Sequence, residues 1–202
     1  MSIQNWFSTP FYHNSYIDRI EDSKFLFDKH KDKFVHTVNN FYTTLKQHDA
    51  YWWSESTVDL TEDADAKSIV KMINHSSTEF ATQLGYDLMN IELFIENIWM
   101  NRMGKGSEVK QHSHGGAFFS GCYYVKVPRG CPSINFYNPL DVLSLPTLPI
   151  RIFNESTSPC VKFHPIDGDI LIWPSHLKHD VHKHLLEEER HIIAFDIKPT
   201  RV

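Results

Sequence analysis

The spacing of hydrophobic residues divides the chain into an N-terminal part with helical periodicity and a C-terminal part with strand periodicity. Apolar residues recur near helical spacing from about 21 to 45, and again from Thr61 to Leu84, where Gly85 is a typical C-cap. After Gly85 the period changes, and Ile91 to Met103 has the pattern of a strand. Shorter strands are predicted at approximately 117–126, 133–138, 148–153, 160–164, 168–173, 178–185 and 190–198.

Two helices followed by about eight short strands predict an α+β protein that is mainly β. The architecture that fits this order is a double-stranded β-helix, that is, a jelly-roll, cupin-like barrel backed by N-terminal helices. A chain of 202 residues suits one well-buried domain. We expect residues 1–90 to form the helical support and residues 91–202 to form the jelly-roll core.

Composition and charge narrow the classes of partner. A hydrophobic content of 41% with 13% aromatic residues is typical of a globular protein. The net charge of −5 provides no global basic field, so we expect no nucleic-acid partner. No apolar stretch approaches the roughly 18 residues of a membrane span, and the N-terminus lacks the features of a secretory leader. With three cysteines, an odd number, we expect free thiols in a soluble, cytoplasmic protein.

Histidines provide the candidate chemistry, since eight of the thirteen lie between His112 and His191. His112 and His114 are two residues apart, so in an extended segment both imidazoles lie on one face, close enough to hold one metal ion. His179 is the favoured distal partner. His176, His182 and His184 compete with His179, and the pair His182 and His184 keeps an alternative metal site open.

A close histidine pair, a distant third histidine and Arg190 eleven residues later resemble the Fe(II)/2-oxoglutarate oxygenase superfamily. Within it, the chain is most similar to a group of phage and marine-bacterial proteins. That group's pattern runs W-x-N, H-x-H, S-G-x-Y-Y-V, F/W-P-S-x-L-x-H-x-V and a closing arginine. The corresponding pieces here are Trp99–Asn101, His112–His114, Ser120–Val125, Trp173–Val181 and Arg190, after a similar opening at Trp6–Pro10.

The resemblance implies His112, His114 and His179 as metal ligands, Fe(II) as the metal, and 2-oxoglutarate and O2 as cosubstrates. Iron oxygenases usually present two histidines and one carboxylate, and here His114 stands where the superfamily has an aspartate. Three neutral imidazoles leave the site at +2 instead of +1, which weakens metal capture but favours a dianionic cosubstrate. Zinc also accepts three histidines, so the metal stays open, as does a water in place of His114.

Arg190 is the expected partner of the distal carboxylate of 2-oxoglutarate, because a guanidinium suits a bidentate grip on a carboxylate. In a strand its same-face neighbours are Ile192 and Ala194, so its charge needs an anion or solvent. The alternative partners are the acidic residues at 187–189. The resemblance adds Asn101 as a further cosubstrate contact, and Tyr124 or Tyr123 as a phenol that is equally compatible with a core position.

The function that follows is an Fe(II)- and 2-oxoglutarate-dependent dioxygenase that hydroxylates a C–H bond and releases succinate and CO2. The substrate stays open among a protein side chain, a nucleobase, an amino acid and a small metabolite. The alternatives are a three-histidine cupin-like metalloenzyme that does not use 2-oxoglutarate, and a non-catalytic jelly-roll binding module with a structural metal. The oligomeric state also stays open, with a homodimer among the possibilities.

Overall fold

The computed structural model describes residues 8–37, 53–56, 58–140, 149–152, 154 and 157–202. The α-helices are α1 (Ile20–Lys29) and α2 (Lys67–Gln83), with short 3₁₀ turns at Ile17–Arg19, Lys31–Lys33 and Ala64–Ala66. The strands are β1 (Tyr12–Ser15), β2 (Phe34–Thr37), β3 (Trp53–Ser56), β4 (Ile91–Met103), β5 (Val109–His112), β6 (Phe119–Lys126), β7 (Ile134–Tyr137), β8 (Cys160–Phe163), β9 (Asp169–Pro174), β10 (His179–Val181) and β11 (Arg190–Arg201).

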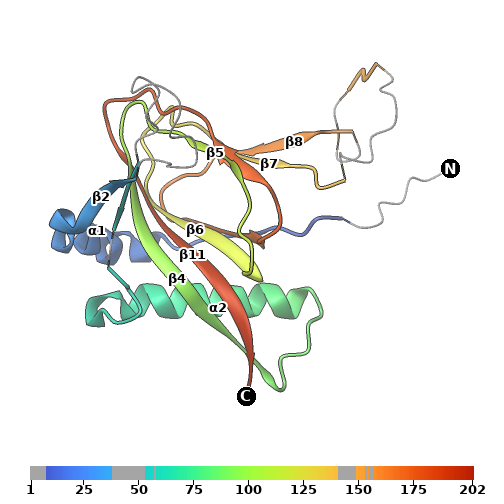
Figure 1. Ribbon diagram of the computed structural model, residues 1–202, viewed down its shortest axis with the longest axis horizontal. Helices are drawn as coiled ribbons and strands as arrows, with labels where there is room; N and C mark the ends of the chain where they lie inside the picture. Colours follow the sequence, from blue (N-terminus) through green and yellow to red (C-terminus); the bar gives the residue numbers. More distant parts are fainter. Residues whose placement is uncertain (1–7, 38–52, 57, 141–148, 153, 155–156) are drawn as a thin grey trace.

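The strands form two antiparallel sheets with both helices on the outer side of the larger one (Figure 1). The seven-stranded sheet has the order β1-β9-β6-β11-β4-β3-β2, and the four-stranded sheet has the order β5-β10-β7-β8. This arrangement confirms the predicted mainly-β, jelly-roll architecture backed by helices. None of the described helices is long and apolar enough to cross a membrane.

Alternation along the strands of the large sheet separates two cores. Because successive strand residues point to opposite faces, Tyr123 and Ile193 pack towards the helices, in a cluster that includes Phe80 of α2. Their neighbours Tyr124 and Ile192 belong to the second cluster, which lies between the two sheets and includes Phe136, Trp173 and Val181. Side chains at alternate positions of β11 therefore face the smaller sheet, where the candidate site lies.

Strand β11 occupies the centre of the large sheet. It pairs with β4 from Arg190 to Arg201 and with β6 on its other side. The inner face of β11 carries Arg190, Ile192, Ala194 and Asp196, whose partners across β6 include Ser120 for Asp196 and Tyr124 for Ile192. One strand thus aligns the residues that a site between the sheets can use.

The first predicted helix is wrong in its length. Helix α1 ends at Lys29 and is followed by a 3₁₀ turn and by β2, whereas residues 38–45 of the prediction lie outside the described part of the chain. The physical reason is the polar run from Lys29 to Lys33, which offers no apolar face to continue the helix. Phe34 keeps the helical spacing from Phe27, yet its ring packs on Phe27 from a strand, with ring centroids 5.6 Å apart.

The other predicted helix and strands agree with the structure to different extents. Helix α2 forms within 61–84, and Gly85 has the left-handed φ of 82° expected of a C-cap. The predicted strand at 148–153 is wrong for residues 149–152, which form none, while the prediction's ends lie outside the described residues. Strands β1 and β5 were not predicted, and the three polar residues among the four of β5 explain why its alternation is weak. Three strands precede Ile91, so this segment supplies edge strands as well as helices.

Gly121 of the Ser120–Val125 motif has a structural role that generates a stability prediction. A Cβ at this position would lie 2.3 Å from Cζ of Phe195 and 2.6 Å from the carbonyl oxygen of Leu171. We expect Gly121→Ala to destabilise the protein by about 1–3 kcal/mol, the usual cost of overpacking, in urea unfolding experiments. Gly104→Ala is the control, since its nearest neighbours are side-chain atoms of Glu189 at 3.9 Å. Equal stability of the two variants would contradict this role for Gly121.

Candidate metal centre

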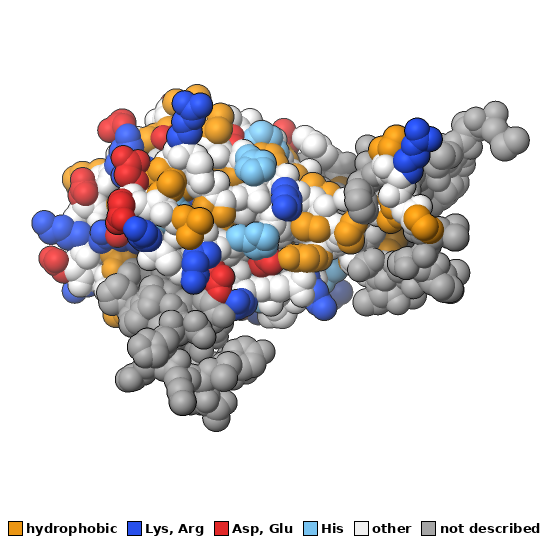
Figure 2. Space-filling model, turned by 90° about the horizontal axis from the view of Figure 1, so that it is seen from above, with side chains coloured by type: hydrophobic (Ala, Val, Ile, Leu, Met, Phe, Trp, Pro, Cys, Tyr) orange, Lys and Arg blue, Asp and Glu red, His pale blue; other side chains and the backbone are white. Residues whose placement is uncertain are grey.

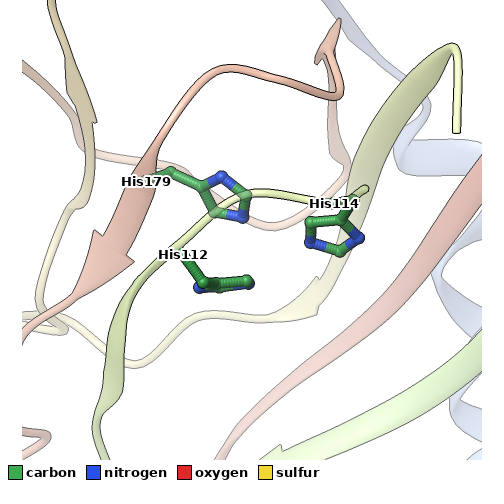
Figure 3. Close-up of side chains that lie close together, drawn as sticks. All are labelled: His112, His114 and His179. Carbon is green, nitrogen blue, oxygen red and sulfur yellow. The ribbon is translucent and has the colours of Figure 1, made fainter. Parts of the chain in front are cut away.

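Three histidines converge where β5, the turn after it and β10 meet (Figure 3). His112 is the last residue of β5 and pairs directly with His179 of β10, while His114 lies in the following turn. One nitrogen from each ring lies within 4.8 Å of the others. The ring centroids of His112 and His179 are 4.3 Å apart, and that of His114 lies 5.1 and 5.3 Å from them. The structure therefore brings together the three residues that the sequence singled out.

Hydrogen bonds fix the tautomers of two of the rings. Nδ1 of His112 lies 2.8 Å from the carbonyl oxygen of Lys110, and Nδ1 of His179 lies 3.0 Å from that of Leu177. A carbonyl oxygen only accepts, so each Nδ1 donates its proton and each Nε2 keeps a lone pair. Metal-ligating histidines usually anchor their second nitrogen in this way.

Burial keeps these imidazoles neutral. It lowers the pKa of His179 to about 3, and the neighbouring His112 and His114 push this pKa in the same direction. Burial also lowers the pKa of His112. The rings of Trp173 and Phe136 lie 4.9 and 6.0 Å from that of His179 and keep water from its inner side. A neutral imidazole is the form that binds a metal ion.

The competing histidines are placed differently. The side chain of His182 is 64% exposed and lies 3.8 Å from the carboxylate of Asp180. His184 is buried, with Nε2 2.7 Å from the carbonyl oxygen of Glu188 and Nδ1 3.8 Å from Sγ of Cys131. His176 is exposed. Among the described residues, none of the three joins a group of potential metal ligands.

Arg190 is a buried cation without an anionic partner among the residues that the structure describes. It opens β11 and is only 1% exposed. Nη1 donates to the carbonyl oxygen of Pro132 at 3.2 Å and Nη2 contacts Sδ of Met103 at 2.9 Å, while the buried Nε has no hydrogen-bond partner. Within the part of the chain that the structure describes, Glu187 pairs with Lys105 and Glu189 with Arg102, so these acids do not neutralise Arg190. An unpaired buried charge is costly, and the site therefore suits an anionic ligand.

Asn101 and Tyr124 share the inner face with Arg190. Both pair with Ile192, Asn101 from β4 and Tyr124 from β6. Oδ1 of Asn101 is buried and has no hydrogen-bond partner within the described part of the chain. The Tyr124 ring lies 5.8 Å from the Arg190 guanidinium. Burial raises the pKa of the Tyr124 phenol, which therefore stays neutral. Among the described residues, one acceptor without a partner, Oδ1 of Asn101, therefore lies on the same face as Arg190.

Asp196 is a site residue that the sequence analysis missed. Its Oδ1 lies 2.8 Å from Nδ1 of His114 and accepts a hydrogen bond from Oγ of Ser120 at 2.7 Å. Ser120 in turn contacts Oγ of Ser175 at 2.8 Å, and the Ser175 carbonyl accepts the backbone N–H of His114 at 2.9 Å. The signal was available, because Asp196 continues the alternation of Arg190, Ile192 and Ala194.

A cleft of about 450 Å³ adjoins this carboxylate. It is lined by Val58, Asp59, Glu96, Asn97, Ile98, Trp99 and Asp196. The indole of Trp99 also lies roughly parallel to the His114 ring, at a centroid distance of 6.2 Å. Histidine side chains reach the surface near the middle of the face seen in Figure 2. Two of the residues that line this cleft, Trp99 and Asp196, are therefore neighbours of His114.

The fold and the site define a jelly-roll protein with a three-histidine group and a buried arginine, and the family comparison agrees with this class. The model of the family described as "Putative 2OG-Fe(II) oxygenase" matches residues 97–196, which include every residue of the site. The predicted resemblance to the Fe(II)/2-oxoglutarate oxygenases is therefore confirmed. The predicted cofactors, Fe(II) and 2-oxoglutarate, are those that give this family its name. Comparison with curated proteins finds no match.

Solved structures support the same fold. A prolyl-4-hydroxylase from Pseudomonas putida is similar with a TM-score of 0.64 and 8% identity, over 94% of this chain and 93% of that one. The α-ketoglutarate-dependent epimerase SnoN from nogalamycin biosynthesis gives 0.68 and 9%, over 96% and 79%. HygX from Streptomyces hygroscopicus, with nickel, 2-oxoglutarate and hygromycin B bound, gives 0.58 and 14%, over 96% and 84%. At these identities the likeness shows the fold and not the reaction.

The arrangement of the histidines predicts which substitutions remove a bound metal. We expect His112→Ala and His179→Ala each to abolish tight Fe(II) binding, because each removes one of three converging nitrogens. His182→Ala is the matched control, since its exposed ring is outside the group. Anaerobic Fe(II) titration measures the affinity of each variant. Full iron occupancy of the His179→Ala protein would show that another residue is the distal ligand.

The lowered pKa of His179 predicts an acid-dependent loss of stability in the metal-free protein. Between its ordinary value of 6.5 and about 3, the unfolded state binds the proton and the folded state does not. The contribution of His179 to the free energy of unfolding is therefore complete above pH 6.5 and declines as the pH falls towards 3. Urea unfolding across this range should show a weaker pH dependence for His179→Gln than for the wild type. Identical slopes would show that His179 titrates normally in the folded protein.

Proposed function

We propose that the protein is an Fe(II)- and 2-oxoglutarate-dependent dioxygenase that hydroxylates a C–H bond of a substrate still to be identified. In the overall reaction, 2-oxoglutarate, O2 and R–H become succinate, CO2 and R–OH. The family match supports the oxygenase class. The hydroxylase assignment is our own, because the structural neighbours include an epimerase as well as hydroxylases.

The observation that carries the proposal is the unpaired charge of Arg190 on the same barrel face as Asn101. Arg190 is buried, its Nε lacks a partner, and no carboxylate of the described residues pairs with it. A dicarboxylate such as 2-oxoglutarate would satisfy this charge with its distal carboxylate in a bidentate contact. Asn101, with a buried and unpartnered Oδ1, is suited to accept a hydrogen bond from an ordered water beside the cosubstrate.

The histidine group fits a divalent iron ion. His112 and His179 present neutral Nε2 atoms because their Nδ1 protons are held by carbonyl oxygens, and His114 completes the set. Bound iron would supply the redox chemistry that couples oxidation of 2-oxoglutarate to insertion of oxygen into the substrate. The three neutral ligands leave the full +2 charge to attract a dianion. His114 in place of a carboxylate thus favours cosubstrate binding at the expense of metal affinity.

The chain's own contribution is to orient the reactants and exclude water. Trp173 and Phe136 pack on the inner side of His179, and Tyr124 packs against the guanidinium of Arg190. The cleft bordered by Trp99 and Asp196 gives the substrate an approach from the side of His114. The substrate is expected to be a protein side chain or a small molecule, with neither nucleic acid nor membrane as a partner.

Cosubstrate binding provides a direct test through Arg190. Removing one partner of a buried, hydrogen-bonded charge pair costs about 2–5 kcal/mol. We therefore expect Arg190→Ala to weaken 2-oxoglutarate binding roughly 30-fold or more, given that 1.4 kcal/mol is about tenfold. The measurement is the shift in thermal midpoint of the Ni(II)-loaded protein as 2-oxoglutarate is added anaerobically. Arg190→Ala should need far more ligand than the wild type for the same shift.

A control measurement of nickel affinity makes the outcome decisive. Nickel affinity without 2-oxoglutarate should be the same in Arg190→Ala and wild type, because Arg190 is not among the converging ligands. An equal response of both proteins to 2-oxoglutarate would show that Arg190 does not bind 2-oxoglutarate. No response of the wild type would favour the three-histidine enzyme that does not use 2-oxoglutarate. That alternative retains metal-dependent O2 uptake without succinate release, whereas a binding module shows neither.

A further inference from the structure

The ring of His114 differs from the other two in what holds it. Carbonyl oxygens of Lys110 and Leu177 anchor His112 and His179, and both carbonyls lie two residues away in sequence. His114 instead faces a carboxylate from the other sheet, with Nδ1 2.8 Å from Oδ1 of Asp196. Nδ1 is thus the His114 nitrogen next to the carboxylate, within ion-pair distance, and Nε2 is the nitrogen that remains to bind a metal ion.

Asp196 is itself firmly held. It is 8% exposed, and the hydroxyl of Ser120 donates to the same Oδ1 at 2.7 Å. Ser120 is the direct cross-strand partner of Asp196 in the β6–β11 ladder, so the backbone fixes their separation. The backbone N–H of His114 donates to the carbonyl of Ser175, whose hydroxyl contacts Ser120. The ring and the carboxylate are thus positioned by the same small network.

From this geometry we infer that Asp196 is a positioning residue for the metal centre, which holds His114 with Nε2 towards the other histidines and supplies a negative charge beside the ring. This inference rests on the proposed function only in requiring that His114 binds the metal. A carboxylate that accepts from the second nitrogen of an imidazole makes that imidazole a more basic ligand. An aspartate at position 114 would place its negative charge directly on the metal. In this chain the ring of His114 separates the negative charge of Asp196 from the metal.

The test measures metal affinity and needs neither 2-oxoglutarate nor turnover. We expect Asp196→Asn to weaken Ni(II) and anaerobic Fe(II) binding about 10–100-fold, the usual cost of losing such a partner. The matched control is Asp180→Asn, which removes another buried carboxylate next to the site. Asp180 is bonded to Asn135 and Tyr137 and touches none of the three rings by hydrogen bond. Its variant removes the same charge near the site without touching His114, so it should lose clearly less affinity than Asp196→Asn.

A double-mutant cycle separates positioning from a general charge effect. In a His114→Asp background, the side chain at 114 is itself a carboxylate that Asp196 repels, so adding Asp196→Asn should leave metal affinity unchanged or raise it. The sign of the effect therefore reverses between the two backgrounds. A purely structural role of Asp196 would weaken binding equally in both.

Several results would overturn the role of Asp196. Unchanged affinity in Asp196→Asn, or the same loss in Asp180→Asn, would overturn the inference, as would an equal loss in the His114→Asp background. If Asp196→Asn does not fold by circular dichroism, Ser120→Ala replaces it, because it removes the hydroxyl that holds Oδ1. A loss of affinity in the same direction supports the role of Asp196, and none overturns it. A wild-type protein that binds neither metal would reject the metal centre itself, and with it the proposed function.

Discussion

The alternation of side chains along β11 is the constraint on which the rest of the structure depends. Ile193, Phe195 and Ile197 hold the helices against the large sheet. The alternate residues of β11 from Arg190 to Asp196 face the smaller sheet, and the first and last of these, Arg190 and Asp196, are charged. A shift of one residue in the pairing of β11 would turn its charged residues towards the helices and its apolar residues towards the site. The long ladders with β4 and β6 therefore fix the core and the site together.

The two charges on the inner face of β11 are handled in opposite ways. Asp196 has partners within the protein, because it accepts a hydrogen bond from Ser120 and lies 2.8 Å from Nδ1 of His114. Arg190 has only a carbonyl oxygen and a thioether as partners among the described residues, and it keeps an unpartnered Nε. An uncompensated buried charge costs stability, and on the function that we propose an anionic cosubstrate would compensate it. Arg190 would then lower the stability of the ligand-free protein in favour of cosubstrate binding.

Sequence reasoning recovered the strand core and the three converging histidines, because alternation and residue type are local signals. The first helix was predicted too long, since Phe34 continues the spacing of Phe27 although it packs from a strand. Strand β5 was missed because its residues are mostly polar, and its place follows from pairing with β10. Asp196 was missed for a related reason, because its place in the site depends on His114, which is 82 positions away in sequence. Only the folded sheets bring Oδ1 of Asp196 to 2.8 Å from Nδ1 of His114.

The position of Asp196 changes how the departure from a histidine–carboxylate metal set should be understood. With three neutral imidazoles alone, the site would hold its metal weakly, and the gain would be a stronger attraction for a dianionic cosubstrate. A carboxylate beside His114 offsets part of the loss, because it raises the basicity of the ring without occupying a position on the metal. It also borders the cleft. A carboxylate ligand at position 114 would place its negative charge on the metal itself, whereas the charge of Asp196 lies beyond the His114 ring, at the edge of the cleft.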